Sequence, residues 1–200
     1  MRLLPGYLSG DQQRGLMAAI RAVLAQAPLY SPAMPRSGSP YSVRMSNCGS
    51  HGWLSDQSGY RYSPVHPVTG APWPAIPRPV LDLWHETTGL AYAPQACLIN
   101  YYGASAKLGL HRDQDEEAKD APILSISLGY TALFRLGGPA RKSPTKSLRL
   151  GSGDLVVLSG PSRHWFHGVD RILPGTSQLL AEGGRINLTL RRVTPPSTSS

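Results

Sequence analysis

The sequence predicts a mainly β protein, built as a sandwich or jelly roll with helices nearer the N-terminus covering one sheet. Alternating apolar and polar residues predict strands over residues 96–102, 123–128, 133–136, 154–158 and 185–191. Glycines and prolines separate these segments at short intervals, as is typical of antiparallel sheets with tight turns. Helical spacing of apolar residues is found ahead of them. One domain of this type accommodates all 200 residues.

Two helices are expected in the N-terminal half. Residues 9–12 (Ser-Gly-Asp-Gln) have the pattern of a capping box, after which apolar residues recur at helical spacing until Pro28. A second helix follows Pro79 and ends by Gly89. The residues expected on its buried face are Val80, Leu83, Trp84 and Thr87.

The stretch between these helices has a different character. Residues 28–79 are rich in proline, serine, glycine and aromatic residues and have no clean period. Because so many aromatic residues are untypical of a disordered linker, we expect an ordered lid or binding loop. The single domain then comprises this lid, a jelly roll over residues 93–193 and a frayed tail over residues 194–200.

Composition indicates where the protein works and what it binds. The net charge of +8 is spread through the chain, and a basic folded protein favours polyanions such as nucleic acid. Cys48 and Cys97 lie in unrelated sequence contexts and form no CxxC pair, so we expect free thiols and a cytoplasmic protein. The sequence has no apolar run near twenty residues and no signal peptide, which argues against a membrane protein.

A candidate metal site begins with His111 and Asp113. On an extended strand these side chains project from the same face and could supply two of the three metal ligands of a 2-His-1-carboxylate triad. The alternative is an exposed His-Asp pair at a strand edge. His164 and His167 are the candidates for the third ligand, and they lie in opposite registers of an extended segment. Spacing alone does not choose between them.

The segment 185–191 suggests an anion site beside the metal. Three apolar residues take one face, and four polar residues, including Arg185, Asn187 and Arg191, take the other. Burying two arginines is unfavourable unless they meet an anion. They lie roughly 20 Å apart along a strand, so one would bind the far end of a dicarboxylate and the other would act near the metal. The alternative is a solvent-exposed face of an outer sheet.

These residues together resemble the bacterial AlkB family of alkylated-DNA repair dioxygenases, which depend on iron(II) and 2-oxoglutarate. The resemblance runs from about Tyr41 to Arg191. The matching blocks are residues 45–49 (MSNCG), 52–53 (GW), 59–64 (GYRYSP), 72–74 (PWP), 97–102 (CLINYY), 111–116 (HRDQDE), 125–129 (SISLG) and 185–191 (RINLTLR). The family's first strand is expected ahead of residues 3–8 (LLPGYL), where little chain is present.

The resemblance implies a double-stranded β-helix core with iron(II) held by His111, Asp113 and His167. It favours His167 because the family places this ligand immediately before a glycine. It also implies that 2-oxoglutarate, with O2 as the second co-substrate, is bound near the iron. The residues implied for 2-oxoglutarate are Asn100, Tyr102, Arg185, Asn187 and Arg191.

Nucleotide contacts are implied in the same way. Trp53 and Tyr60 would belong to a nucleotide-recognition lid that Tyr62 supports, and Asp115 would face the base. Spacing also places Asp115 on the face of Asp113 if the strand continues, the alternative being a solvated acid beside Glu116 and Glu117. Arg141 aligns with a phosphate-binding position, and the basic run 141–149 is either a phosphate contact or a solvated hairpin.

The expected function is therefore oxidative removal of alkyl groups from bases such as 1-methyladenine and 3-methylcytosine, with release of formaldehyde and succinate. Lesions that pair poorly are easily flipped out of the stack. The expected partner is single-stranded alkylated DNA, with double-stranded DNA and RNA as further candidates, and the expected state is a monomer. The alternatives are the same iron chemistry on RNA, a protein side chain or a small molecule, and a non-catalytic binder of damaged nucleic acid.

Overall fold

The computed structural model of the protein describes residues 1–196. In chain order its elements are β1 (Arg2–Leu4), α1 (Gly10–Gln26), β2 (Val43–Gly49), β3 (Gly52–Asp56), β4 (Gly59–Ser63), α2 (Arg78–Thr88), β5 (Ala96–Tyr102), β6 (Leu108–His111), β7 (Ile123–Gly129), β8 (Thr131–Leu136), β9 (Lys146–Leu150), β10 (Leu155–Leu158), the 3₁₀ helix η1 (Gly160–His164), β11 (His167–Leu173) and β12 (Arg185–Arg191). Within the expected tail, the backbone N–H of Thr194 donates to Gln95 Oε1 at 2.8 Å, and residues 197–200 lie outside the described part.

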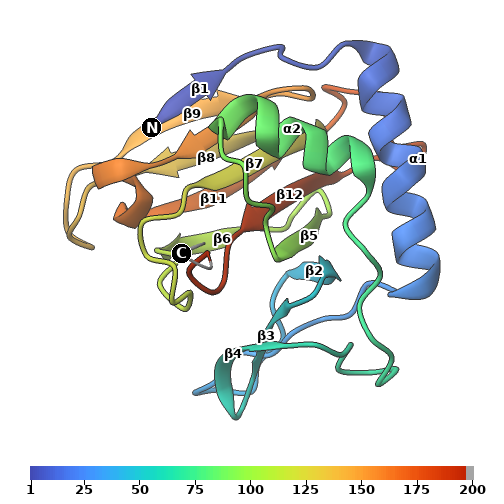
Figure 1. Ribbon diagram of the computed structural model, residues 1–200. Helices are drawn as coiled ribbons and strands as arrows, with labels where there is room; N and C mark the ends of the chain where they lie inside the picture. Colours follow the sequence, from blue (N-terminus) through green and yellow to red (C-terminus); the bar gives the residue numbers. More distant parts are fainter. Residues whose placement is uncertain (197–200) are drawn as a thin grey trace.

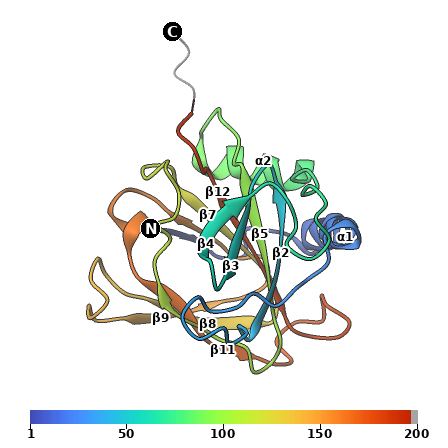
Figure 2. The ribbon, with the colours of Figure 1, turned by 90° about the horizontal axis from the view of Figure 1, so that it is seen from below.

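Two antiparallel sheets form the predicted jelly roll. The larger sheet has the order β1-β10-β7-β12-β5-β2, and the smaller has the order β6-β11-β8-β9. Seen from below, β8, β9 and β11 lie on one side of the molecule, and the helices lie with the larger sheet on the other (Figure 2). Apolar side chains from both sheets pack between them. Those of one cluster are Val43, Met45, Leu98, Tyr102, Ala132, Val169 and Ile172.

The two predicted helices cover the outer face of the larger sheet (Figure 1). The predicted capping box is present, because Ser9 Oγ accepts from the backbone of Gln12 and the Gln12 side chain accepts from the backbone of Ser9. Helix α2 begins at Arg78, one residue before the predicted proline, and ends at the left-handed Gly89, whose φ of 71° suits a residue without a side chain. Its predicted apolar face is buried.

The segment expected to be a lid has two parts. Strand β2 pairs with β5 and belongs to the larger sheet, whereas β3 and β4 form a separate hairpin in which Trp53 lies opposite Tyr62. The pairing of β2 with β5 also places Cys48 directly opposite Cys97. Both thiols are free, as expected, and buried, although strands distant in sequence place them directly opposite each other.

Strand β12 lies at the centre of the larger sheet, between β7 and β5. Its register places Asn187 opposite Asn100 and Arg185 opposite Tyr102 on β5. Directly opposed residues in an antiparallel pair share a face, so these four side chains project toward the smaller sheet. In residues 1–196 no helix combines the length and apolar character needed to cross a bilayer.

Candidate active site

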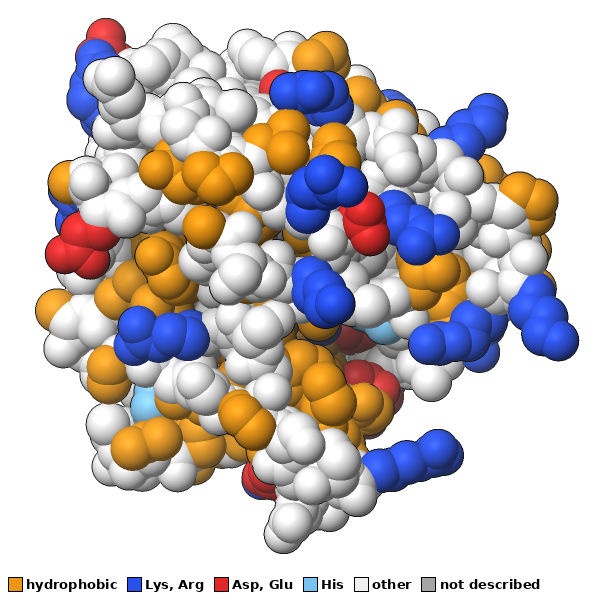
Figure 3. All heavy atoms as spheres, turned by 180° about the vertical axis from the view of Figure 1, so that it is seen from behind, with side chains coloured by type: hydrophobic (Ala, Val, Ile, Leu, Met, Phe, Trp, Pro, Cys, Tyr) orange, Lys and Arg blue, Asp and Glu red, His pale blue; other side chains and the backbone are white. Residues whose placement is uncertain are grey.

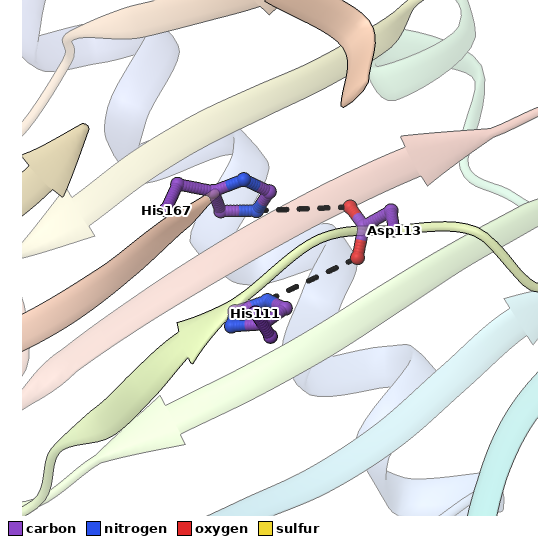
Figure 4. A group of neighbouring side chains, drawn as sticks. All are labelled: His111, Asp113 and His167. Atoms are coloured by element: carbon purple, nitrogen blue, oxygen red, sulfur yellow. Dashed lines mark ion pairs between the residues drawn. The ribbon is translucent and has the colours of Figure 1, made fainter. Parts of the chain in front are cut away.

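Three ligand-type side chains meet between the two sheets (Figure 4). His111 ends β6 and His167 begins β11, and the two residues are directly paired across these strands. Nε2 of His111 lies 3.9 Å from Asp113 Oδ1, and Nε2 of His167 lies 3.8 Å from Asp113 Oδ2. The candidate ligand atoms all lie within 4.8 Å of one another, which is close enough for a single ion.

The route by which Asp113 reaches this group differs from the sequence expectation. Strand β6 ends at His111, so Asp113 lies in the irregular segment that follows and does not extend the strand. Of the two candidate histidines, His167 joins the group, whereas His164 ends the helix η1. Strand pairing with β6, which spacing did not reveal, decides between them.

Backbone carbonyl groups orient both imidazole rings. Nδ1 of His111 lies 2.9 Å from the carbonyl oxygen of Gly109, and Nδ1 of His167 lies 3.0 Å from that of Trp165. Each Nδ1 therefore carries the proton that it donates, and each Nε2 is left free toward Asp113. Burial, and then the neighbouring His111, lower the pKa of His167 to about 4, which keeps its ring neutral and able to bind a metal.

Arg191 holds the carboxylate of Asp113. Its Nη2 donates to Asp113 Oδ1 at 2.8 Å, and both side chains are buried. Burial opposes ionisation of Asp113, but the positive charge of Arg191 holds its pKa below the usual range. Asp113 is thus an anion whose Oδ2 has no hydrogen-bond partner among the described residues.

A cavity of about 580 Å³ contains this centre and extends along β5 and β12. The expected site residues that line it are Trp53, Tyr60, Asn100, Tyr102, His111, Asp113, Asp115, Arg141, His167, Arg185, Asn187 and Arg191. Tyr62 does not line it. Instead, the hydroxyl of Tyr62 donates to Glu116 Oε1 at 2.5 Å.

The inner end of the cavity is built around Arg185. Its Nη2 donates to Ser127 Oγ at 2.7 Å and its Nη1 to the carbonyl oxygen of Leu150 at 3.0 Å. These partners are uncharged, and burial lowers the pKa of Arg185 to about 10. Among residues 1–196 its hydrogen-bond partners include no carboxylate, so this buried guanidinium could hold an anion. The two arginines of β12 therefore take different ends of the cavity, as the strand spacing predicted.

Comparisons with known proteins agree with this geometry. A match to the 2OG-Fe(II) oxygenase superfamily covers residues 1–191. The chain is 54% identical over 188 residues to an alpha-ketoglutarate-dependent dioxygenase AlkB homolog of Caulobacter vibrioides, covering 94% of this chain and 85% of that protein. It is 42% identical to the alpha-ketoglutarate-dependent dioxygenase AlkB of Escherichia coli, covering 88% and 83% of the two chains. The solved structure of OsALKBH1 matches with a TM-score of 0.80 at 32% identity, covering 95% of each chain.

The chain belongs to the AlkB family of 2OG-Fe(II) oxygenases. It is accordingly an enzyme, a dioxygenase that uses iron(II), 2-oxoglutarate and O2. The double-stranded β-helix expected from the sequence is the fold of this family, and the two sheets described above form it.

Iron(II) and 2-oxoglutarate fit the residues of this AlkB-family site. Four buried polar atoms that have no hydrogen-bond partner in the described part of the chain belong to cavity residues. They are Asp113 Oδ2, Asn100 Oδ1, Arg185 Nε and Arg191 Nε. Leaving such groups unsatisfied costs about 1–3 kcal/mol each, so a bound cation and dicarboxylate that satisfied them would be stabilised. Two imidazoles and one carboxylate leave further coordination positions open, as this oxygenase chemistry requires.

The outer end of the cavity carries the aromatic side chains of the hairpin. The rings of Trp53 and Tyr60 are stacked, with centroids 5.5 Å apart. Trp53 Nε1 donates to Asp115 Oδ2 at 2.8 Å, which joins the hairpin to the segment that follows the metal residues. Asp115 does not continue a strand, because β6 ends at His111, yet it still lines the cavity.

Arg141 lies at the rim of the AlkB-family cavity. Its Nη1 donates to the carbonyl oxygen of Leu110 at 3.0 Å, and its guanidinium lies 5.9 Å from the centre of the Phe166 ring. Arg112 approaches the same ring at 5.5 Å. Part of the basic run 141–149, expected as a phosphate contact or a solvated hairpin, forms strand β9 from Lys146 onward.

Sequence reasoning missed a buried network behind the metal centre. Glu116 is buried, whereas the run of acids around it suggested a solvated loop. It accepts from Arg163 Nη2 at 2.9 Å and from the hydroxyl of Tyr62, and its Oε1 lies 3.5 Å from Arg191 Nη1. Arg191 therefore connects Glu116 to Asp113. Spacing provided no signal for this role, because the three partners of Glu116 come from three separate segments.

Proposed function

We propose that the protein oxidatively removes alkyl groups from N-alkylated bases, such as 1-methyladenine and 3-methylcytosine, in single-stranded nucleic acid, mainly DNA. The observation that carries this proposal is that the candidate metal ligands lie in the same cavity of about 580 Å³ as Trp53 and Asp115. Membership of the AlkB family supports it. The protein would thus act in the repair of alkylated DNA.

His111, Asp113 and His167 would hold iron(II), with Asp113 contributing the unpartnered Oδ2. When bound together, iron(II), 2-oxoglutarate and O2 supply the oxidation of the N-methyl group, which leaves as formaldehyde while 2-oxoglutarate becomes succinate and CO2. Because both Nδ1 atoms are occupied by backbone carbonyls, the two rings offer only Nε2 to a metal. This fixes the orientation of the centre.

The co-substrate would lie along β5 and β12. Arg185 would bind the far carboxylate of 2-oxoglutarate, because it is a buried cation with uncharged partners. Asn100, Tyr102 and Asn187 line the same part of the cavity and would complete the pocket, with Arg191 at the metal end. Cross-strand pairing of Arg185 with Tyr102, and of Asn187 with Asn100, keeps these groups on one face.

The base would enter between the hairpin and the metal centre. Trp53 offers an indole face that attracts a cationic methylated ring, and the carboxylate of Asp115 favours the same positive charge. Tyr60 would extend the stacking surface, while Tyr62 would act from behind through Glu116. Arg141 at the rim would bind a backbone phosphate. The enzyme is proposed to act as a cytoplasmic monomer.

The test is formaldehyde release from a 3-methylcytosine oligonucleotide supplied with iron(II) and 2-oxoglutarate, with Asp113→Ala as the inactive control. Matched single-stranded DNA, double-stranded DNA and RNA carrying the same lesion establish the preferred strand. Release of succinate without repair of the base in any of these substrates would refute the proposal and favour a protein or small-molecule substrate. Tight binding of methylated DNA with no turnover would favour a non-catalytic binder.

A further inference from the structure

The positive charge of the protein is concentrated on the smaller sheet. Residues 104–112, 131–150 and 165–173 contain β6, β8, β9, β11 and their adjoining loops. Together they carry eight lysines and arginines and one acid, Asp170. The rest of the chain carries twelve lysines and arginines and eleven acids. Nearly all of the net charge of +8 therefore lies in this part of the molecule. Such asymmetry indicates a surface for a polyanion.

Strand register brings several of these cations together on the outer face of the sheet. Phe134 lines the cavity and therefore points inward, so Leu133 and Arg135 point outward. Arg149 on β9 and Arg171 on β11 are the direct partners of Leu133 on either side. Both arginines are exposed. They thus flank Leu133 on the outer face, with Arg135 two residues further along β8.

A groove connects this outer face with the active-site cavity. It measures about 480 Å³, and its charged lining residues are Lys107, Arg135 and Asp170, two cations and one acid. Met34 and Tyr41 line both this groove and the cavity, so the two adjoin at these residues. Viewed from behind, lysine and arginine side chains gather around a hollow in which histidine and acidic side chains are visible (Figure 3).

We propose that Lys107, Arg135, Arg149 and Arg171, here called the basic face, bind the phosphodiester backbone of the single strand that flanks the target nucleotide. The strand leaves the cavity past Tyr41, follows the groove to Arg135, and reaches Arg149 and Arg171. The location of the target base rests on the proposed function. Three exposed cations (Lys107, Arg149 and Arg171) and the half-buried Arg135, with one acid among them, suit successive phosphates, because each contact releases condensed counter-ions without reading the bases.

The test compares Arg149→Gln/Arg171→Gln with Arg21→Gln/Arg78→Gln. Both variants lose two positive charges, but Arg21 and Arg78 lie on the helices. Arg135 is left intact because it donates to Thr145 Oγ1 at 2.8 Å. Binding of unmodified single-stranded DNA of about 15 nucleotides is measured by fluorescence anisotropy over a range of salt concentrations. Demethylation kinetics are measured on a methylated trinucleotide and on the same lesion in the longer strand.

The basic-face variant is expected to bind the long strand severalfold more weakly, with a slope of log K against log salt smaller by about 1.4, as expected for two lost phosphate contacts. Its KM for the long substrate rises, while its KM for the trinucleotide stays at the wild-type value. Equal behaviour of the two variants, or equal weakening on the trinucleotide, would overturn the inference. Failure of the wild type to demethylate would instead refute the proposed function, and the anisotropy measurement would still decide the inference.

Discussion

Arg191 and Asp113 lie 78 residues apart in the chain, yet Arg191 Nη2 donates to Asp113 Oδ1 at 2.8 Å. The other amino group of Arg191 lies 3.5 Å from Glu116 Oε1 and donates to the hydroxyl of Tyr62 at 3.3 Å. The carboxylate of Asp113 is therefore connected, through the guanidinium of Arg191, to strand β4. This strand belongs to the hairpin that carries Trp53 and Tyr60. Through Arg191, the orientation of Asp113 depends also on Glu116 and Tyr62, neither of which lines the cavity.

Glu116→Gln should weaken metal binding without disturbing the cavity. The substitution preserves shape but leaves Arg191 and Arg163 with less negative charge between them, so Arg191 competes more strongly for Asp113. We expect Mn²⁺ affinity, measured by electron paramagnetic resonance without oxygen, to fall about tenfold. Tyr62→Phe should lower it less, because only one hydroxyl is lost. Glu117→Gln, at the exposed neighbouring residue, provides the control. An equal loss of Mn²⁺ affinity in Glu117→Gln would contradict the role of Glu116.

His167→Ala should abolish metal binding at the site, whereas His164→Ala should leave it intact. The reason is that Nε2 of His167 faces Asp113, while His164 lies in η1 outside the metal group. The amount of Mn²⁺ bound to each variant is measured by electron paramagnetic resonance. Thermal unfolding checks that both variants are folded. Retention of site-bound Mn²⁺ by folded His167→Ala would show that the ligand set is wrong.

Arg185→Lys should raise the KM for 2-oxoglutarate by roughly 10- to 100-fold, because lysine keeps the positive charge but loses a charge-assisted hydrogen bond worth on the order of 1.5–3 kcal/mol. A lysine cannot reproduce the planar fork that contacts Ser127 and a carboxylate together. Steady-state kinetics at varied 2-oxoglutarate measure the effect. Arg192→Lys is the matched control, since Arg192 bonds the carbonyl oxygen of Ala93 away from this strand face. An unchanged KM for 2-oxoglutarate in Arg185→Lys would place the dicarboxylate elsewhere.

Asp115→Asn should reduce kcat/KM for cationic lesions by about tenfold, because the nearby negative charge that favours them is lost. A neutral lesion such as 3-methylthymine should be affected much less, and the two substrates compared in parallel measure the selectivity. Trp53→Phe keeps an aromatic face but removes the indole N–H that holds Asp115 at 2.8 Å. It should therefore weaken turnover of the cationic lesion more than that of the neutral one, because Asp115 is no longer held in place. Equal loss on charged and neutral lesions in Asp115→Asn would indicate a structural role only.

The core strands were predictable because their patterns are local. Strands β5 and β12 occur at the predicted residues, since alternation and flanking turn residues define them without reference to other segments. Strand β2 was not predicted, because the segment around Cys48 and Trp53 has no clean period and gains its strand structure by pairing with β5. The same pairing places Cys48 against Cys97, which no spacing rule would indicate.

The sequence by itself determined the chemistry available: the residue types of the metal group, the alternation that turns Arg185 and Arg191 inward, and the aromatic side chains of the hairpin. Only the tertiary structure decided which histidine of the pair meets Asp113, that Glu116 is buried, and that the cations of β8, β9 and β11 share a face. The physical reason is that periodicity specifies the face of one strand, whereas contacts between strands depend on register and on burial from many segments at once.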